Sequence, residues 1–142
     1  MILQFLLATA FIAGGIIITA EHVVKGYTTD YVANSTYDVA TIYMDLPYGY
    51  DFDCRKLKTG ETVTVKGYPY INGQYVYTEL TTTVIADGNE VIDGRKSVVL
   101  ATSLIGGFSG SPVFDRDGDV VAVVTNSIDS VDRSLATSVC NL

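Results

Sequence analysis

Short β-rich runs dominate this chain and limit what it can fold into. No stretch of its 142 residues sustains the i, i+3, i+4, i+7 apolar spacing of a long helix. Runs rich in β-branched and aromatic residues recur instead, at 30–36, 38–44, 61–71, 74–86, 96–105, 119–128 and 134–140. Turn signals separate them: Pro47-Tyr48-Gly49, Lys58-Thr59-Gly60-Glu61, Asn72-Gly73, Asp87-Gly88-Asn89, Asp93-Gly94 and Asp117-Gly118. About nine short strands joined by tight turns predict an all-β barrel or sandwich.

Three dipeptides that contain glycine predict tight hairpins. Asn72-Gly73 and Asp117-Gly118 suit the type I′ turn, because both of its central residues need a positive φ. Gly14-Gly15 divides the apolar segment 1–20 into two β-rich runs, which we interpret as a buried strand–turn–strand unit. A signal peptide or membrane anchor is the alternative. A signal peptide normally has a Lys or Arg before its apolar stretch, and none is present here. We therefore expect no membrane span, and no compartment is assigned.

Composition argues against one class of partner. Nine Lys and Arg against sixteen Asp and Glu give a net charge of −7, which disfavours nucleic-acid binding. The polar segment 46–58 is the expected seam between an N-terminal half, 1–53, and a C-terminal half, 54–142. Cys54 and Cys140 permit at most one bridge; two separate buried thiols are the favoured interpretation and a disulfide is the alternative. With a single histidine in the chain, no structural zinc site is expected, and no cofactor is implied.

Glycines crowd around one serine in the stretch GGFSGSP, residues 106–112. A serine hydroxyl is a poor nucleophile unless a base takes its proton and fixed donors receive the charge that develops on the attacked carbonyl. Glycines let consecutive backbone N–H groups turn toward one point, as an oxyanion hole requires. Gly107 and Ser109 are the natural donors. The alternative is that the stretch is only a tight loop between two strands.

His22 is the one histidine, so any mechanism that uses an imidazole must use it. It follows the run GGIIITAE, and we expect it at the end of a rigid strand, where a base is held well for catalysis. A lone histidine is more often structural, but its combination with a later glycine-rich serine loop favours catalysis. An α/β-hydrolase is disfavoured, because that fold needs G-x-S-x-G on a strand-to-helix elbow and a histidine after the serine.

These segments resemble those of the chymotrypsin-like (trypsin-like) serine peptidases, an all-β family with two small antiparallel barrels. ITAEHVV at 18–24 is similar to the family's TAAH segment, DVATIYM at 38–44 to the strand that carries its aspartate, and GGFSGSPVF at 106–114 to its G-x-S-G-[GS]-P segment. GDVVAVVTNS at 118–127 and TGETVTVKGYPY at 59–70 resemble two further strands of its second barrel. The matches keep the family's order and span nearly the whole chain from Phe11 onward.

The resemblance implies a serine endopeptidase that hydrolyses peptide bonds of a polypeptide substrate through an acyl-enzyme. It implies His22 as general base and then acid, Asp38 as the group that orients the imidazole, and Ser109 as nucleophile. The oxyanion hole would come from the amides of Gly107 and Ser109. The aspartate has competitors, and Asp38 is preferred because the apolar run behind it would anchor it at a barrel rim; the others are Asp30, Asp45, Asp51 and Asp53. The alternative function is a double-barrel binding or structural module without turnover, and the oligomeric state is left open.

The resemblance also indicates a primary specificity pocket. Its base would be Ser103 and Leu104, and its walls would be Thr125, Asn126, Ser127 and 135–137. No aspartate falls at this base, so a preference for Lys or Arg is not supported. The serine motif is closest to that of glutamyl endopeptidases, but their pocket histidine and threonine are matched here by Val124 and Leu104. We therefore expect a neutral or apolar side chain before the scissile bond.

Several features depart from the digestive members of that family. Phe108 stands where they carry an aspartate that binds a newly cut N-terminus, and no IVGG-like start is present. Activation by that route is not expected, and Phe108 is expected to anchor the serine loop by apolar packing. The N-terminal half has room for only four or five strands, so its barrel should be abbreviated. Such a chain resembles the minimal members that viruses and phages encode. The acidic stretch at 115–119 hints at calcium, but a charged hairpin tip is the favoured interpretation.

Overall fold

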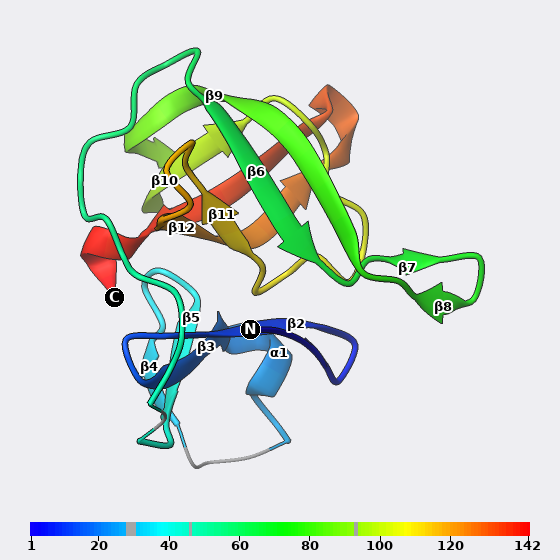
Figure 1. Ribbon diagram of the computed structural model, residues 1–142. Coiled ribbons are helices and arrows are strands. Elements are labelled where there is room, and N and C mark those ends of the chain that lie inside the picture. Colours follow the sequence, from blue (N-terminus) through cyan, green and yellow to red (C-terminus); the bar gives the residue numbers. More distant parts are fainter. Residues whose placement is uncertain (28–30, 46, 93) are drawn as a thin grey trace.

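The N-terminal half of the molecule is a five-stranded antiparallel sheet. The computed structural model describes residues 1–27, 31–45, 47–92 and 94–142 (Figure 1). The strand order is β1-β2-β3-β5-β4, with bounds β1 Ile2–Phe5, β2 Ala8–Ala13, β3 Ile16–Ala20, β4 Val32–Asn34 and β5 Val39–Tyr43. A one-turn helix, α1 (Glu21–Val24), follows β3. The predicted hairpin at Gly14-Gly15 is confirmed, since β2 and β3 pair on either side of it.

The C-terminal half closes into a six-stranded barrel in the order β10-β13-β12-β11-β6-β9. Its strands are β6 Thr62–Gly67, β9 Thr78–Ile92, β10 Arg95–Leu100, β11 Pro112–Phe114, β12 Val120–Ile128 and β13 Arg133–Ser138. A separate hairpin, β7 (Tyr70–Ile71) with β8 (Gln74–Tyr75), projects from the barrel (Figure 1). Two short 3₁₀ helices, η1 (Asp129–Val131) and η2 (Val139–Asn141), flank β13.

The all-β class with an abbreviated first half is confirmed. The five described strands of the N-terminal half form an open sheet, whereas those of the C-terminal half form a closed ring. Within the described residues, no helix is long and apolar enough to cross a bilayer. The predicted division at 53 and 54 stays a prediction, because the two halves are joined by a common core.

That common core holds the sheet against the barrel. Phe11, Ile18 and Val39 of the sheet pack with Phe114 and Val123 of the barrel in one buried cluster. All five side chains are at most 3 % exposed, so the two halves meet over a dry apolar contact that resists sliding. The relative position of residues carried by different halves is therefore fixed by packing.

The structure confirms the predicted turn at 72–73 and corrects those at 117–118 and 87–89. Asn72 and Gly73 have φ of +49° and +84°, which confirms the type I′ turn. At Asp117-Gly118 only Gly118 is positive, at +83°, and its N–H donates to Asp115, so the type I′ prediction is wrong and the turn begins earlier. The predicted turn at 87–89 is also wrong: β9 runs through it, and Gly88 (φ +95°) lies where the pairing with β10 shifts register. A bulge there lets one long strand bend around the barrel. Asp93 of the last signal lies outside the described residues.

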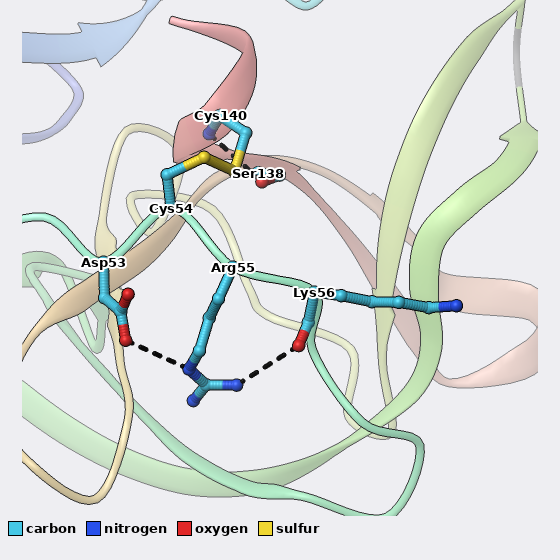
Figure 2. Close-up of a disulfide and its surroundings, with 6 residues drawn as sticks. All are labelled: Asp53, Cys54, Arg55, Lys56, Ser138 and Cys140. Carbon is cyan, nitrogen blue, oxygen red and sulfur yellow. Dashed lines mark hydrogen bonds and ion pairs between the residues drawn. A yellow bond between two sulfur atoms is a disulfide. The ribbon is translucent and has the colours of Figure 1, made fainter.

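A disulfide joins Cys54 to Cys140, with a Cα–Cα distance of 4.9 Å (Figure 2). The prediction of two separate thiols is therefore wrong. The cysteines are 86 residues apart, and only the fold brings them together. The connection between the halves runs beside both of them, through bridges of Tyr50 to Ala13 and of Phe52 to Val120, and so reaches η2 near the C-terminus.

Arg55, next to the disulfide, pairs with Asp53 (Figure 2) and also with Glu61 and Asp115. Its guanidinium grips Glu61 with two N–H groups, donates to Asp53 at 3.1 Å and reaches Asp115 at 3.3 Å. Hydrogen bonding from Arg55 lowers the pKa of Glu61. Asp115 also accepts the amides of Asp117 and Asp119 at 3.0 Å. The acidic carboxylate at the start of 115–119 thus shapes the hairpin tip and pairs with an arginine.

Candidate active site

His22 lies in α1, directly after β3, and not at the strand end that the sequence predicted. The apolar register of β3 continues only to Ala20, after which the chain turns through one helical turn. The neighbours of His22 in this helix, Val23 and Val24, are buried, and they hold the turn against the sheet. The imidazole itself is 47 % exposed, so it is presented to solvent from a fixed base.

Asp38 holds that helix from the turn just before β5. Its backbone carbonyl accepts the Glu21 amide at 2.9 Å, and its Oδ1 accepts the His22 amide at 2.9 Å. Its other oxygen, Oδ2, lies 2.5 Å from His22 Nδ1. The residue has a φ of +57°, and its side chain is 12 % exposed. One carboxylate therefore fixes both the backbone and the ring of His22.

The competing aspartates do not share this arrangement. Asp53 pairs with Arg55 and not with His22. Within the described part of the chain, neither Asp45 nor Asp51 bonds to His22. Asp30 lies outside the described residues. The preference for Asp38 over these residues rests on its two bonds to His22.

Ser109 lies in the loop between β10 and β11, on the other half of the molecule. Its hydroxyl donates to the carbonyl of Thr125 at 3.2 Å. Among the described residues it makes no hydrogen bond to His22. Both side chains nevertheless line one cavity of about 230 Å³, which also contains Gly107. The structure therefore brings the predicted base and nucleophile to a common space, with the hydroxyl turned toward the barrel.

The backbone of the serine loop leaves two amides without a partner among the described residues. The Gly106 carbonyl accepts the Tyr70 amide at 2.7 Å, and the Phe108 carbonyl accepts the Ser111 amide at 2.9 Å. In a trans peptide the N–H points opposite to the C=O, so the next amides, those of Gly107 and Ser109, face away from these partners. Neither amide donates to another group in the part of the chain that the structure describes. Such paired free donors are what an anionic oxygen would need.

Close backbone contacts explain the glycines of this loop. A Cβ on Gly107 (φ +100°) would lie 2.3 Å from the Tyr68 carbonyl oxygen, and one on Gly110 (φ +86°) 2.1 Å from the Thr9 carbonyl oxygen. Phe108, between them, is 3 % exposed and packs into the barrel core. Apolar packing of Phe108 therefore holds the loop, as the sequence predicted.

Thr9 is a residue that sequence reasoning missed. It is fully buried in β2, and its hydroxyl donates to the Gly107 carbonyl at 2.8 Å while accepting the Tyr68 amide at 2.9 Å. Its own amide donates to the Ser109 carbonyl at 3.0 Å. One threonine of the sheet thus fixes the serine loop of the barrel. A buried polar residue within an apolar strand was the only available signal, and it does not name its partners.

The residues expected to form the primary specificity pocket are tied to β12 and β13. The Leu104 amide donates to Ser134 at 2.8 Å, and Ser127 donates to the Leu104 carbonyl. Thr125 donates to Leu135 at 3.3 Å, the Ser103 amide donates to Asp132 at 2.9 Å, and Asn126 accepts from Arg95. Among the described residues, none of the five predicted pocket residues lines the cavity of His22 and Ser109; these five are Ser103, Leu104, Thr125, Asn126 and Ser127. Their role in specificity stays a prediction.

Comparison with solved structures gives the fold. The Rv3671c protease of M. tuberculosis in its active form superposes with a TM-score of 0.73 at 24 % identity, over 94 % of this chain and 69 % of that one. The inactive form of the same protease superposes with a TM-score of 0.72 at 24 % identity, over 99 % of this chain and 83 % of that one. Its serine-to-alanine mutant, also in the inactive form, gives a TM-score of 0.70 at 23 % identity, over 99 % of this chain and 80 % of that one.

Comparison by sequence gives the family. No curated protein matches the chain significantly. Residues 8–123 match the family model of the trypsin-like peptidase domain. That match includes both the helix of His22 and the loop of Ser109, and it covers most of the chain. The chain belongs to the trypsin-like peptidase domain family.

Proposed function

We propose that this chain is a serine endopeptidase that cleaves peptide bonds through an acyl-enzyme, with His22, Asp38 and Ser109 as a catalytic triad. The observation that carries the proposal is the pair of bonds from Asp38 to His22, on an imidazole that shares a cavity with Ser109. A carboxylate that anchors both backbone and ring restricts the histidine to one orientation, as positional catalysis requires.

In this mechanism the Nδ1–H group of His22 donates a hydrogen bond to Asp38. The proton stays on Nδ1, so Nε2 is free to act as the base. Ser109 must turn its hydroxyl from the Thr125 carbonyl toward Nε2. That turn is a rotation between staggered χ1 positions, and catalytic hydrogen bonds are often incomplete in a free enzyme. Substrate that fills the cavity would exclude water and favour the turned hydroxyl.

The Ser109 oxygen then attacks the substrate carbonyl while His22 takes the hydroxyl proton. The amides of Gly107 and Ser109 stabilise the negative charge on the carbonyl oxygen. As the C–N bond breaks, His22 gives its proton to the leaving amine, and the acyl group stays on Ser109. A water molecule, deprotonated by His22, attacks the ester and releases the acid, which restores the serine. We expect a neutral or apolar side chain before the scissile bond.

A catalytically inactive binding or structural module is the second candidate. One observation favours it, namely that the Ser109 hydroxyl bonds to Thr125 and not to His22. A serine that never leaves Thr125 could not act as a nucleophile.

A fluorophosphonate probe separates the two candidates, because it labels only an activated serine. We expect labelling of the wild-type protein and loss of labelling in Ser109→Ala and His22→Ala. Ser35→Ala, which changes an exposed serine outside the cavity, should label like the wild type. Wild-type labelling no greater than that of Ser109→Ala would refute the peptidase and support the inactive module.

A further inference from the structure

The turn between β1 and β2 consists of two leucines, Leu6 and Leu7, both partly in solvent. They are 38 % and 66 % exposed, and Leu6 has a φ of +55°. Two-residue hairpin turns favour Gly, Asn and Asp, because other side chains strain a left-handed backbone. This turn therefore carries local strain and exposes apolar surface together, a combination that concentrates at functional sites.

The same turn forms one wall of the cavity that holds His22 and Ser109. Leu6 and Leu7 of the turn and Ala8 of β2 line it, together with Val23 of α1 and Tyr27, which follows that helix. No Asp, Glu, Lys or Arg is among the described lining residues. At about 230 Å³ the cavity is smaller than ligand pockets of roughly 300–1,000 Å³, so it suits one side chain better than an extended segment.

The position of His22 decides which part of a substrate enters this cavity. In the proposed mechanism, His22 protonates the leaving amine, so the residue after the scissile bond departs on the side of the imidazole. Val23 and Tyr27 lie just beyond His22 in the chain and line this cavity. The residues expected to hold the side chain before the scissile bond lie elsewhere, on β12 and the loop before Ser109.

We propose that this cavity binds the side chain that follows the scissile bond, and that the Leu6-Leu7 turn makes it selective for a large apolar residue such as Leu, Ile, Met or Phe. The inference rests on the proposed peptidase function. The leucines provide the apolar contact, and the strain at Leu6 is the stability cost of holding a leucine there.

The test is a digest of a mixed-sequence peptide library, in which each product's new N-terminus reports the residue after the cut. With the wild-type protein we expect large apolar residues to be enriched about tenfold over Gly, Ser and Asp at that position. In Leu6→Gly/Leu7→Asn the enrichment should fall to near unity. A glycine relieves the left-handed strain, so this variant should be at least as stable as the wild type in urea and should still label with the fluorophosphonate probe.

Leu142→Gly is the matched control, because Leu142 is similarly exposed, at 41 %, and lies outside the cavity. It should keep the wild-type enrichment. A wild-type protein that labels and cleaves without apolar enrichment, or a double variant that keeps the enrichment, overturns this inference and leaves the proposed function standing. A wild-type protein that neither labels nor cleaves overturns both.

Discussion

Asp38 combines three contacts that usually need several residues. It accepts the two first amides of α1, through its backbone carbonyl and Oδ1, and it binds the ring of His22 through Oδ2. A short helix of four residues has little stability of its own, so these contacts from the residue that precedes β5 are what hold the histidine in place. The role of Asp38 as anchor and its proposed role in catalysis can be separated by changing only its charge.

Asp38→Asn is expected to keep the fold and lose activity. The amide oxygen can still accept the His22 amide, but the NH₂ group would face Nδ1 as a donor and favour the wrong tautomer. In the proposed triad, kcat should fall by about 10⁴-fold, as it does in established Ser-His-Asp triads. Steady-state kinetics on a peptide substrate measures this, and Asp51→Asn, at an exposed position, is the control. An active Asp38→Asn variant would remove Asp38 from the mechanism.

Thr9→Val is expected to disturb the serine loop from the opposite half of the molecule. Valine keeps the shape and the backbone bonds of Thr9 but removes the hydroxyl between Gly107 and Tyr68. An unpaired, partly buried amide at Tyr68, together with the lost bond to the buried Gly107 carbonyl, should lower the free energy of unfolding by about 1–3 kcal/mol. Displacement of the loop should lower kcat by about tenfold or more with a smaller change in KM.

Thr9→Ser tests whether the hydroxyl of Thr9 is responsible. Serine keeps the oxygen, so it should restore most of the lost kcat, while its missing methyl group costs some stability. Equal kcat values for the wild type and the valine variant would assign Thr9 a purely structural role.

Among the elements, the strands were easier to predict than the places where they bend. Alternation and turn dipeptides identified the runs that became β5, β6 and β12. The one-turn helix at His22 and the bulge at Gly88 carry no such signal, because each is imposed by neighbouring elements: α1 by Asp38, and the bulge by the curvature of the barrel. A glycine within a strand pattern is compatible with either a turn or a bulge.

The segment that joins the two halves should respond to acid through Glu61. Its side chain is 16 % exposed and bound to Arg55, which lowers its pKa below 4.5 in the folded protein. A lowered folded pKa means that its stabilisation is present above the unfolded value and is lost as the pH falls through the folded one. Glu61→Gln should therefore be less stable than the wild type at pH 7, by about 1–3 kcal/mol.

The difference between Glu61→Gln and the wild type should start to shrink as the pH falls below about 4.5, where the unfolded wild-type chain binds a proton at Glu61, and should vanish only at the lower pH at which the folded carboxylate is protonated. Urea unfolding at a series of pH values measures it. Glu79→Gln is the control, since Glu79 forms a more exposed pair with Lys66. A difference that stays constant to low pH would mean that the Arg55–Glu61 pair does not stabilise the fold.

The disulfide joins the segment between the two halves to η2, near Leu142. Closing a loop of 86 residues removes conformational entropy from the unfolded chain and is worth about 4–5 kcal/mol. The double variant Cys54→Ser/Cys140→Ser should lose stability of that order in urea unfolding. Neither cysteine lines the cavity of His22, so its activity at low temperature should remain. Equal stability of variant and wild type would mean that the bridge adds no constraint, because the unfolded chain already keeps the two cysteine positions close together.

The all-β class, the candidate residues His22 and Ser109, and the glycines around that serine could all be read from the sequence alone. These are local properties, because strand alternation, turn chemistry and backbone freedom are encoded within a few neighbouring residues. Contacts between distant residues became visible only in the folded molecule. The fold formed the two bonds of Asp38, already favoured by the sequence, to His22, joined Cys54 to Cys140, and put Thr9 against the serine loop. Pairing of β3 with β5 sets the first of these contacts and packing of the sheet on the barrel sets the last, and no local pattern records such distances.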